Sequence, residues 1–337
     1  MKPVTPSHAS SHDVARRAGV SHMTVSRVFR SPDKVAKKTR EHVQAVAREM
    51  GYVPSKIPRG LISNHTDLAA IIVPSLENSL FTPTIDGLAS ALKPIGCDVI
   101  VASYENDVEL EEEVVQKLMS RRPVGIVLHG TEHTENCRDL LAHTKIPVIE
   151  IGDLIDHPIQ SVVSYSNFEA AKTMTRHLIE RGFERIAFAG LVPKSSHRAA
   201  QRLLGYQSAL DAAQLPFNPD CVFAVPPGFV GGAEFVRNSK FQDQNIEAVF
   251  FASDVHAVGA ILECQKLGIK VPQELAIAGF DAHEIGNLCT PSITSLSIPR
   301  REIGIGVGNI ITRYLEEGIC EAHRKDLGFD LIIRSST

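Results

Sequence analysis

A short stretch near the N-terminus carries side chains whose types and spacing suit contacts with the edges of DNA bases. Four of them fall on one face of a predicted helix: His22, Met23, Ser26 and Arg27. Val25 and Val28 fall on the opposite face, where they can pack inward. A helix of this kind can lie in a major groove with its N-terminal residues against base edges. The pattern therefore predicts a helix that reads DNA.

Two further helices would hold this reading helix in place. Ser10 or Ser11 can cap the first of them, and Asp13 in its first turn meets the positive end of the helix dipole. Gly19 suits a left-handed turn before the reading helix, which Ser21 would cap. A third helix would cover both through an apolar stripe made of Val43, Val46, Ala47 and Met50. The three together predict a helix-turn-helix unit.

The charge of the chain is divided unevenly between this unit and the rest. Residues 1–64 hold 12 Lys and Arg against 4 Asp and Glu, a net charge of +8. Subtraction from the whole-chain totals of 35 and 39 leaves 23 basic and 35 acidic residues, a net charge of −12, on residues 65–337. A basic head on an acidic body indicates that the head alone has a polyanionic partner.

Beyond a linker, the pattern changes to apolar strands that alternate with amphipathic helices. Strands are predicted at 68–73, 97–102, 124–128, 147–151, 185–190, 221–225, 247–251 and 275–280. Helices are predicted near 81–94, 108–121, 135–143, 167–182, 198–213, 230–239, 255–267 and 300–317. Such alternation is typical of parallel sheets covered by helices on both faces. Two groups of four strands, split near Val163–Tyr165, predict two doubly wound halves with a cleft between them.

No pattern in the chain favours an enzyme, a membrane protein or a metal protein. The run Gly304-Ile305-Gly306-Val307-Gly308 has its third glycine one residue too early for a dinucleotide loop and follows charged residues, so close helix packing explains it better. His129, Glu132 and His133 have no further His or Cys at zinc spacing, so we predict no metal and no cofactor. The six cysteines form no CxxC pair. No apolar span or export signal is present, and we predict a cytoplasmic protein.

Several segments of the chain resemble the lactose/galactose-repressor (LacI/GalR) family. In the first 64 residues these are DVARRAGVSHMTVSRV, KKTREHV and GYVPS. In the remainder they are IIVPSLENSLF, IPVIEIGD, FFASDVHAVGAI and IKVPQELAIAGFD, with TPSITSL after it. The segments follow the family's order over almost the whole chain. Within the family, SNFEAAKTM and ECQKLGIKVPQELAIAGFDAHEIG look most like the gluconate-operon repressors.

The resemblance implies an α/β protein with a small all-α helix-turn-helix head and a periplasmic-binding-protein-like body of two doubly wound parallel-sheet subdomains. The head would comprise residues 1–54, the hinge 55–66, and the effector-binding and dimerisation body 67–337. The two subdomains of the body would comprise about 67–163 with 298–325, and 164–297 with 326–337. The family also implies a homodimer, sometimes a tetramer, whose heads bind a near-palindromic double-stranded DNA operator.

The resemblance assigns roles to individual residues of the head. His22, Met23 and Arg27 would read bases, and Arg27 is the best candidate for a bidentate contact to guanine. Met23 offers only apolar contact, for instance to a thymine methyl group. The residues that would hold phosphates and fix the register are Ser21, Thr24, Ser26, Lys38 and Thr39.

The hinge of the family folds on the DNA. Ser55 could cap a short helix there, and Leu61 matches the residue that wedges into the minor groove and bends the duplex. Pro58 would fall in the first turn, where no intrahelical bond is lost, whereas Gly60 weakens the helix. The length of the hinge helix therefore stays open.

In the body, the resemblance implies that a small effector binds in the cleft. Its contacts would be Leu80, Phe81, Glu150, Arg202, Ser253 and Asp281. Arg202 and Asp281 match the family's effector-binding Arg and carboxylate, and Asp281 follows a strand, where open α/β sheets bind ligands. Gly152 stands where many sugar-binding members have Asp, which leaves Glu150 or Asp153 to take over polar recognition. A guanidinium that faces an anion favours a sugar acid, because Arg pairs with carboxylates bidentately.

Some of these residues also have an ordinary structural interpretation. Arg202 could lie on the surface of an amphipathic helix, and Glu150 could point away from the cleft. Phe81 is as consistent with a core position as with a pocket wall. Asp254 is expected to cap the helix that follows it, and His283 is a secondary candidate for ligand contact.

We therefore expect a cytoplasmic transcriptional repressor of a sugar or sugar-acid operon that leaves its operator when a small effector binds, with gluconate or a related sugar acid favoured. The alternative is a corepressor-dependent regulator or activator that responds to another sugar, a sugar phosphate or a nucleobase. A solute-binding protein is more remote because of the basic head. A sugar-acid oxidoreductase is disfavoured because the nucleotide fingerprint is missing.

Overall fold

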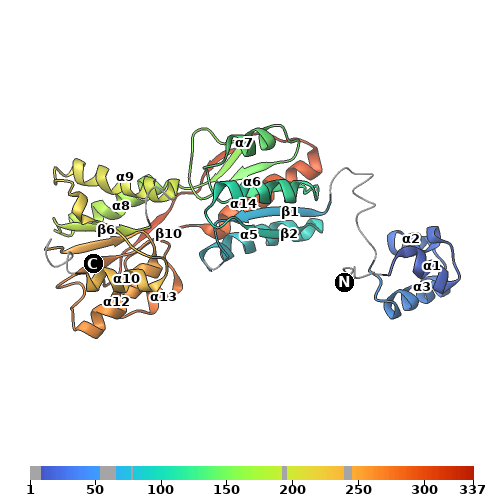
Figure 1. The fold of residues 1–337 in the computed structure, drawn as a ribbon, viewed down its shortest axis with the longest axis horizontal. Coiled ribbons are helices and arrows are strands. Elements are labelled where there is room, and N and C mark those ends of the chain that lie inside the picture. Colours follow the sequence, from blue (N-terminus) through green and yellow to red (C-terminus); the bar gives the residue numbers. More distant parts are fainter. Residues whose placement is uncertain (1–8, 54–65, 77–78, 192–195, 239–244) are drawn as a thin grey trace, which may run out of the picture. The chain divides into compact units, whose positions relative to one another are not determined.

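The computed structural model describes residues 9–53, 66–76, 79–191, 196–238 and 245–337. The chain divides into two compact units, drawn in Figure 1. One unit, Met1–Thr66, contains the predicted head and hinge. The other unit, Asp67–Thr337, is the body.

The described part of the head is a bundle of three helices. They are α1 (Ser11–Ala18), α2 (His22–Arg30) and α3 (Lys37–Glu49), with a 3₁₀ turn at Pro32–Lys34 before α3. Their apolar faces meet in one buried cluster of Val14, Ala15, Ala18, Val25, Val28, Val43, Val46 and Ala47. The helix-turn-helix unit and its third supporting helix are therefore as predicted.

Local interactions determine where the helices of the head begin and end. Ser10 caps α1 through a capping box, in which its hydroxyl accepts the Asp13 N–H at 3.2 Å and the Asp13 carboxylate accepts the Ser10 N–H at 3.0 Å. Gly19 ends α1 with a left-handed φ of 65°. The Ser21 hydroxyl then accepts the Thr24 N–H at 3.1 Å and caps α2. These features confirm the predicted turn and the predicted cap.

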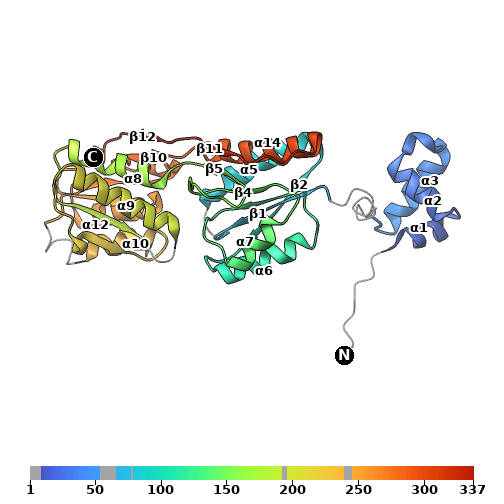
Figure 2. The same cartoon turned by 90° about the horizontal axis from the view of Figure 1, so that it is seen from above.

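The first half of the body is a parallel sheet of six strands in the order β11-β5-β4-β3-β1-β2. Its strands are β1 (Leu68–Val73), β2 (Asp98–Ser103), β3 (Gly125–Leu128), β4 (Val148–Glu150), β5 (Ser161–Ser164) and β11 (Arg324–Asp326). Its helices are α5 (Thr82–Leu92), α6 (Val108–Met119), α7 (Glu135–Ala142) and α14 (Arg300–Glu317). Helices α5 and α14 cover one face of the sheet, and α6 and α7 cover the other (Figure 2).

The second half is a parallel sheet of four strands in the order β7-β6-β8-β9. Its strands are β6 (Ile186–Gly190), β7 (Val222–Ala224), β8 (Ala248–Phe251) and β9 (Ala276–Ala278). Its helices are α8 (Asn167–Glu180), α9 (His197–Ala212), α10 (Phe229–Arg237), α12 (Asp254–Leu267) and the short α13 (Glu284–Leu288). Helices α8 and α9 pack on one face, and α10 and α12 on the other (Figure 1). No described helix is long and apolar enough to cross a membrane.

All eight predicted strands are present, but the described residues contain four more. These are β5, β11, β10 (Ser295–Ser297) and β12 (Asp330–Ile332), of which the last two pair antiparallel. The prediction of four strands in each half is therefore wrong for the first sheet, which has six. The additional strands were missed because they are short and rich in polar residues, with sequences such as RKD and SLS.

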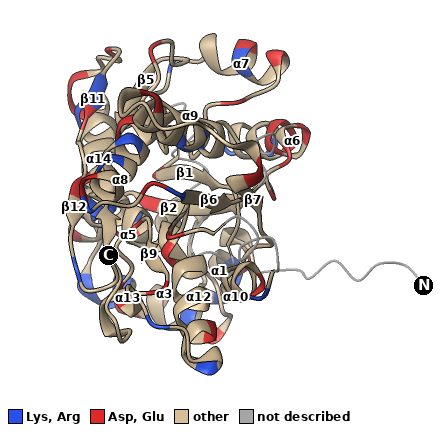
Figure 3. Cartoon of the chain, turned by 90° about the vertical axis from the view of Figure 1, so that its left-hand side faces the viewer, with Lys and Arg blue, Asp and Glu red and all other residues tan. Residues whose placement is uncertain are grey.

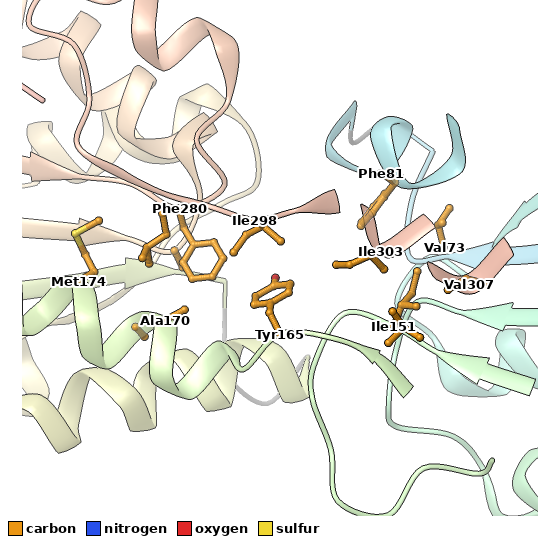
Figure 4. Close-up of a cluster of buried hydrophobic side chains, with 14 of the residues drawn as sticks. Val73, Phe81, Ile151, Tyr165, Ala170, Met174, Phe280, Ile298, Ile303 and Val307 are labelled. Atoms are coloured by element: carbon orange, nitrogen blue, oxygen red, sulfur yellow. The ribbon is translucent and has the colours of Figure 1, made fainter. Parts of the chain in front are cut away.

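One cluster of buried apolar side chains runs through both halves of the body. Figure 4 shows Phe81 and Ile151 on the side of the first sheet, Phe280 on the side of the second, and Tyr165 between them. The ring centroids of Tyr165 and Phe280 are 6.2 Å apart. Phe81 is buried in this cluster, so its side chain occupies a core position, one of the two positions that the sequence allowed.

Helices α5 and α14 approach each other through glycines. A Cβ atom added at Gly304 would lie 2.0 Å from the Thr84 carbonyl oxygen, and one added at Gly87 would lie 2.2 Å from that of Arg301. Both contacts are with backbone atoms, which cannot rotate away as a side chain can. The glycine run of α14 is therefore used for close helix packing, as predicted, and not for a nucleotide loop.

We expect Gly304→Ala to destabilise the body and Gly306→Ala to do so much less. An added methyl at Gly304 overpacks the backbone of α5, at a typical cost of about 1–3 kcal/mol. At Gly306 the nearest atom is a methyl carbon of Val163, 3.2 Å away, which has some freedom to move. Thermal denaturation of both variants measures the difference. Equal melting temperatures would show that the contact between α5 and α14 does not depend on Gly304.

Candidate functional site

The outer face of α2 carries the residues predicted to contact bases. His22, Met23 and Arg27 are exposed, and Met23 retains 66% of its accessible surface. Within the described head, no ion pair or side-chain hydrogen bond is found for Arg27, so its guanidinium is available to a partner. Val25 and Val28 are fully or almost fully buried on the opposite face.

The hydroxyl groups predicted to hold phosphates lie next to this face. The side-chain oxygens of Ser21 and Thr24 are 2.8 Å apart at the start of α2, and Ser26 is half-buried. Lys38 and Thr39 lie in the first turn of α3, where the side chain of the N-cap residue Ala36 makes no capping bond. A helix start without a side-chain cap and with a lysine beside it can bind a phosphate. Ser55 and Leu61, the two predicted hinge contacts, lie outside the described residues.

His12 is a neighbour of the reading face that sequence reasoning missed. Its imidazole stacks on that of His22, with ring centroids 4.2 Å apart and planes 7° from parallel. The contact joins the first turns of α1 and α2. The sequence signal was a histidine at the start of each helix, but only the packing of the helices brings the rings together.

In the body, Arg202 projects from α9 and is held by neutral groups of the second half. Its Nε donates to the Asn167 side-chain oxygen at 2.8 Å, and one Nη donates to the Ala252 carbonyl. The guanidinium carbon lies 3.6 Å from the ring centroid of Phe280, a cation–π contact. The other Nη is 3.5 Å from the Tyr165 hydroxyl. Arg202 is therefore a positioned side chain and not a loose surface residue.

Asp281 follows β9, and its carboxylate pairs with Arg300 of α14, a residue that the sequence analysis did not select. The Asp281 side chain is 3% exposed and that of Arg300 is 11% exposed. The Nε of Arg300 is buried and has no hydrogen-bond partner among the described residues. Near this pair, a cavity of about 380 Å³ is lined by Leu80, Asp281 and Arg300, among others. The structure thus brings Leu80 and Asp281 to one cavity, whereas the predicted contacts Phe81, Arg202 and Ser253 are not part of its lining.

Phe81 follows Leu80 in the chain and contacts His129, the residue after β3. Its ring meets the imidazole of His129 edge to face, with centroids 4.5 Å apart. The Nδ1 of His129 accepts a hydrogen bond from Arg198 of α9 at 2.9 Å. Burial holds the pKa of His129 well below its ordinary value, and the nearby Arg198 charge lowers it further. His129 is therefore neutral, which leaves its Nδ1 free to accept.

The residues at the start of α12 differ from the prediction. Ser253 caps the helix by accepting the Val255 N–H, whereas Asp254 was expected to do so. Asp254 is instead buried and accepts hydrogen bonds from the Ser295 hydroxyl and the His283 N–H, both at 2.6 Å. Burial raises the pKa of Asp254 to about 7. Through the His283 N–H, the Asp254 carboxyl group fixes the turn after β9 that carries Asp281. Ser253, and not Asp254, is the N-cap residue of α12.

Glu150 belongs to a buried ionic triad rather than to the wall near Arg202. The imidazole of His133 bonds the Glu111 carboxylate through Nδ1 at 2.5 Å and that of Glu150 through Nε2 at 3.3 Å. The second Glu150 oxygen accepts the Ile159 N–H, so both oxygens have partners within the first half. The reason is strand alternation: Glu150 faces α6, whose acidic residues appear in red in Figure 3.

Burial would lower the pKa of His133, but its bonds to the two carboxylates outweigh this and raise the pKa to about 9. Ligand atoms of Glu111, His133 and Cys137 lie within 4.8 Å of one another, and this donor set could hold a metal ion. The hydrogen bond between Glu111 and His133 accounts for the arrangement without one.

Two models of known families match the chain. Residues 11–55 match the model described as bacterial regulatory proteins, lacI family. Residues 175–337 match a periplasmic binding protein-like domain. The first match covers the described head and extends to residue 55. The second covers most of the second half of the body together with α14 and β11 of the first half.

Relatives match over nearly the full length. The transcriptional regulator GntR of Escherichia coli is 34% identical over 322 residues, which cover 95% of this chain and 96% of that protein. GntR of Pseudomonas aeruginosa is 32% identical over 329 residues, covering 97% and 95%. The crystal structure of a LacI-family transcriptional regulator from Silicibacter pomeroyi superposes with a TM-score of 0.88 at 29% identity, covering 97% of this chain and 99% of that one.

We expect His133→Gln to destabilise the body most at neutral pH and below. The variant leaves two buried carboxylates without a cation, and breaking a buried pair typically costs about 3–5 kcal/mol. Because the folded-state pKa of His133 is raised from 6.5 to about 9, its contribution is complete below pH 6.5 and is lost as the pH rises through about 9. Urea denaturation of both proteins across this range measures the difference in free energy of unfolding.

That difference should shrink as the pH rises. His143→Gln is the matched control, since His143 is exposed and bonds only the Asp139 carbonyl. A difference for His133→Gln that is constant with pH would contradict the ionic role of this imidazole.

Proposed function

Because the chain belongs to the lacI family of bacterial regulatory proteins, we propose that it represses a sugar-acid operon and is released from its operator by gluconate or a related acid. The chain is a DNA-binding transcriptional repressor and not an enzyme. As in the family, its partners are operator DNA, a small-molecule effector and a second copy of itself. Since DNA is the partner, we place it in the cytoplasm.

The observation that carries the proposed effector class is the environment of Arg202. Its hydrogen-bond partners are an amide oxygen, a backbone carbonyl and, at 3.5 Å, the Tyr165 hydroxyl, and no carboxylate pairs with it among the described residues. A largely buried cation is costly unless an anion compensates it. A sugar acid would supply a carboxylate in the geometry that a guanidinium prefers. The resemblance of two segments of the body to gluconate-operon repressors supports the same class.

We assign DNA binding to residues 1–54, a hinge to 55–66, and effector binding with dimerisation to 67–337. The division of the structure between Thr66 and Asp67 supports the last boundary. The subdomains of the body remain those inferred from sequence: 67–163 with 298–325, and 164–297 with 326–337. The hinge contacts Ser55 and Leu61 rest on the sequence resemblance alone.

The proposed effector contacts are Leu80, Phe81, Arg202, Ser253 and Asp281, to which the structure adds Arg300. Release would follow from linkage: an effector that binds better to the arrangement with low operator affinity shifts the population towards it. Couplings of this kind are typically about 1–3 kcal/mol. Glu150 is left out of this set because both of its carboxylate oxygens are engaged elsewhere.

We expect Arg27→Ala to relax sequence preference at one base position in each half-site. Loss of a bidentate contact to guanine typically costs about 1–3 kcal/mol against the correct base and much less against others. The measurement is operator affinity for a set of duplexes with each base changed in turn. Arg48→Ala is the matched control, because Arg48 is an exposed cation in the last turn of α3. Equal loss of affinity at every sequence would assign Arg27 to phosphate contact instead.

We expect Arg202→Ala to bind the operator but to have lost the response to gluconate. The wild-type operator affinity should fall when gluconate is added, while that of the variant should stay constant. The matched control is Arg176→Ala, which removes an exposed cation paired with Glu180 on α8. A rise of wild-type affinity with gluconate would identify a corepressor. Release of Arg202→Ala at the wild-type gluconate concentration would refute the role of Arg202.

A further inference from the structure

We propose that the effector carries two anionic groups and that Arg198 binds the second of them. This inference rests on the proposed function, in which Arg202 binds the carboxylate of a sugar acid. The second group would be a phosphate or a second carboxylate at the other end of the sugar chain. Both present anionic oxygens to a guanidinium, and the experiment distinguishes them.

Arg198 and Arg202 lie one helical turn apart on α9, at a spacing that places side chains on the same face. Their hydrogen bonds draw them towards different sheets. Arg198 donates to His129, which follows β3 of the first sheet. Arg202 donates to the carbonyl of Ala252, which follows β8 of the second sheet. The two guanidiniums are therefore held for separate anionic groups, and a single carboxylate would serve only one of them well.

The charges around α9 do not balance among the described residues. Burial lowers the pKa of Arg198, and the nearby charges of Arg202 and Arg300 lower it further. Of these three cations, only Arg300 has a carboxylate partner, Asp281. Two positive charges thus lack a counter-ion in a largely buried site. Buried charges are costly unless they are paired, so a ligand with two negative charges fits this site best.

Two acidic side chains near Arg198, those of Asp153 and Glu132, are engaged with His197. The Asp153 carboxylate lies 3.2 Å from the His197 Nε2 and raises the pKa of that imidazole. The Glu132 carboxylate accepts the backbone N–H of His197 at 2.8 Å. Neither forms an ion pair with Arg198 in the described structure.

A small cavity adjoins Arg198. Its volume is about 30 Å³, and its lining includes Tyr104, Thr131, Glu132 and Arg198. The Thr131 hydroxyl is buried and has no hydrogen-bond partner among the described residues. Buried hydroxyls are rarely left unpaired. An anionic oxygen that entered this cavity would meet the Thr131 hydroxyl and the Arg198 guanidinium in its lining, beside the Glu132 carboxylate.

The test is isothermal titration of the full chain with D-gluconate, D-glucarate and D-gluconate 6-phosphate. We expect at least one dianion to bind the wild type ten-fold or more tightly than gluconate does. Whichever dianion binds more tightly identifies the second group as carboxylate or phosphate. Arg198→Gln should bind gluconate and have lost the preference for the dianion, whereas Arg198→Lys should keep part of it. The matched control is Arg176→Gln, which should keep the wild-type ratio.

The outcomes separate this inference from the proposed function. If the wild type binds gluconate as tightly as both dianions, the inference is wrong and the sugar-acid effector stands. If Arg198→Gln keeps the wild-type ratio, Arg198 does not contact the second group. If the wild type binds none of the three acids, the proposed effector class itself is wrong. A misfolded variant would lose gluconate as well, so retained gluconate binding identifies a specific effect.

Discussion

The proposed function of the body depends on the positive charge of Arg198 and Arg202, which no carboxylate pairs with among the described residues. A chain that buries cations without carboxylates loses hydration energy and does not recover it from its own side chains. Neutral acceptors, an imidazole nitrogen, an amide oxygen and a backbone carbonyl, fix the direction of each guanidinium but leave its charge. This arrangement favours an anionic effector, and in the proposed mechanism the affinity for that anion would supply the energy that shifts the repressor between arrangements.

The helix that carries these charges is anchored by its opposite face. Tyr206 and Leu210 of α9 belong to the large apolar cluster, and the Tyr206 hydroxyl donates to the Ile186 carbonyl at 2.8 Å. A Cβ atom added at Gly205 would lie 2.2 Å from the Phe168 carbonyl oxygen, so α8 and α9 touch at this point. Because the helix is packed this tightly, its backbone gives the two arginine side chains a fixed base. An effector bound at Arg202, as proposed, would contact a helix that is packed into the second half of the body.

Local sequence signals predicted most of the fold, because they act within a few residues. The caps at Ser10 and Ser21 and the left-handed Gly19 are interactions of this range. Long apolar runs such as LAAIIV identified the central strands. Strand β11, with the sequence RKD and three exposed residues, has no such run. It forms because the edge of β5 offers backbone groups for pairing, and the partner residues lie 162 positions earlier in the chain, as for Arg324 and Val162.

The site residues also divide into those that a local sequence signal marks and those that only the fold brings to the site. Family resemblance pointed to Arg202 and Asp281 because their surrounding motifs are distinctive, whereas Arg198 and Arg300 were missed because nothing in their own neighbourhoods marks them. For Glu150 the sequence left two orientations open, although alternation with Ile149 and Ile151 already favours the other face of β4. What alternation cannot supply is the partner, since His133 and Glu111 reach it from separate segments. To interpret a buried charged residue from sequence, one must therefore first establish which face of its strand it lies on. The residue that supplies its counter-ion must then be found.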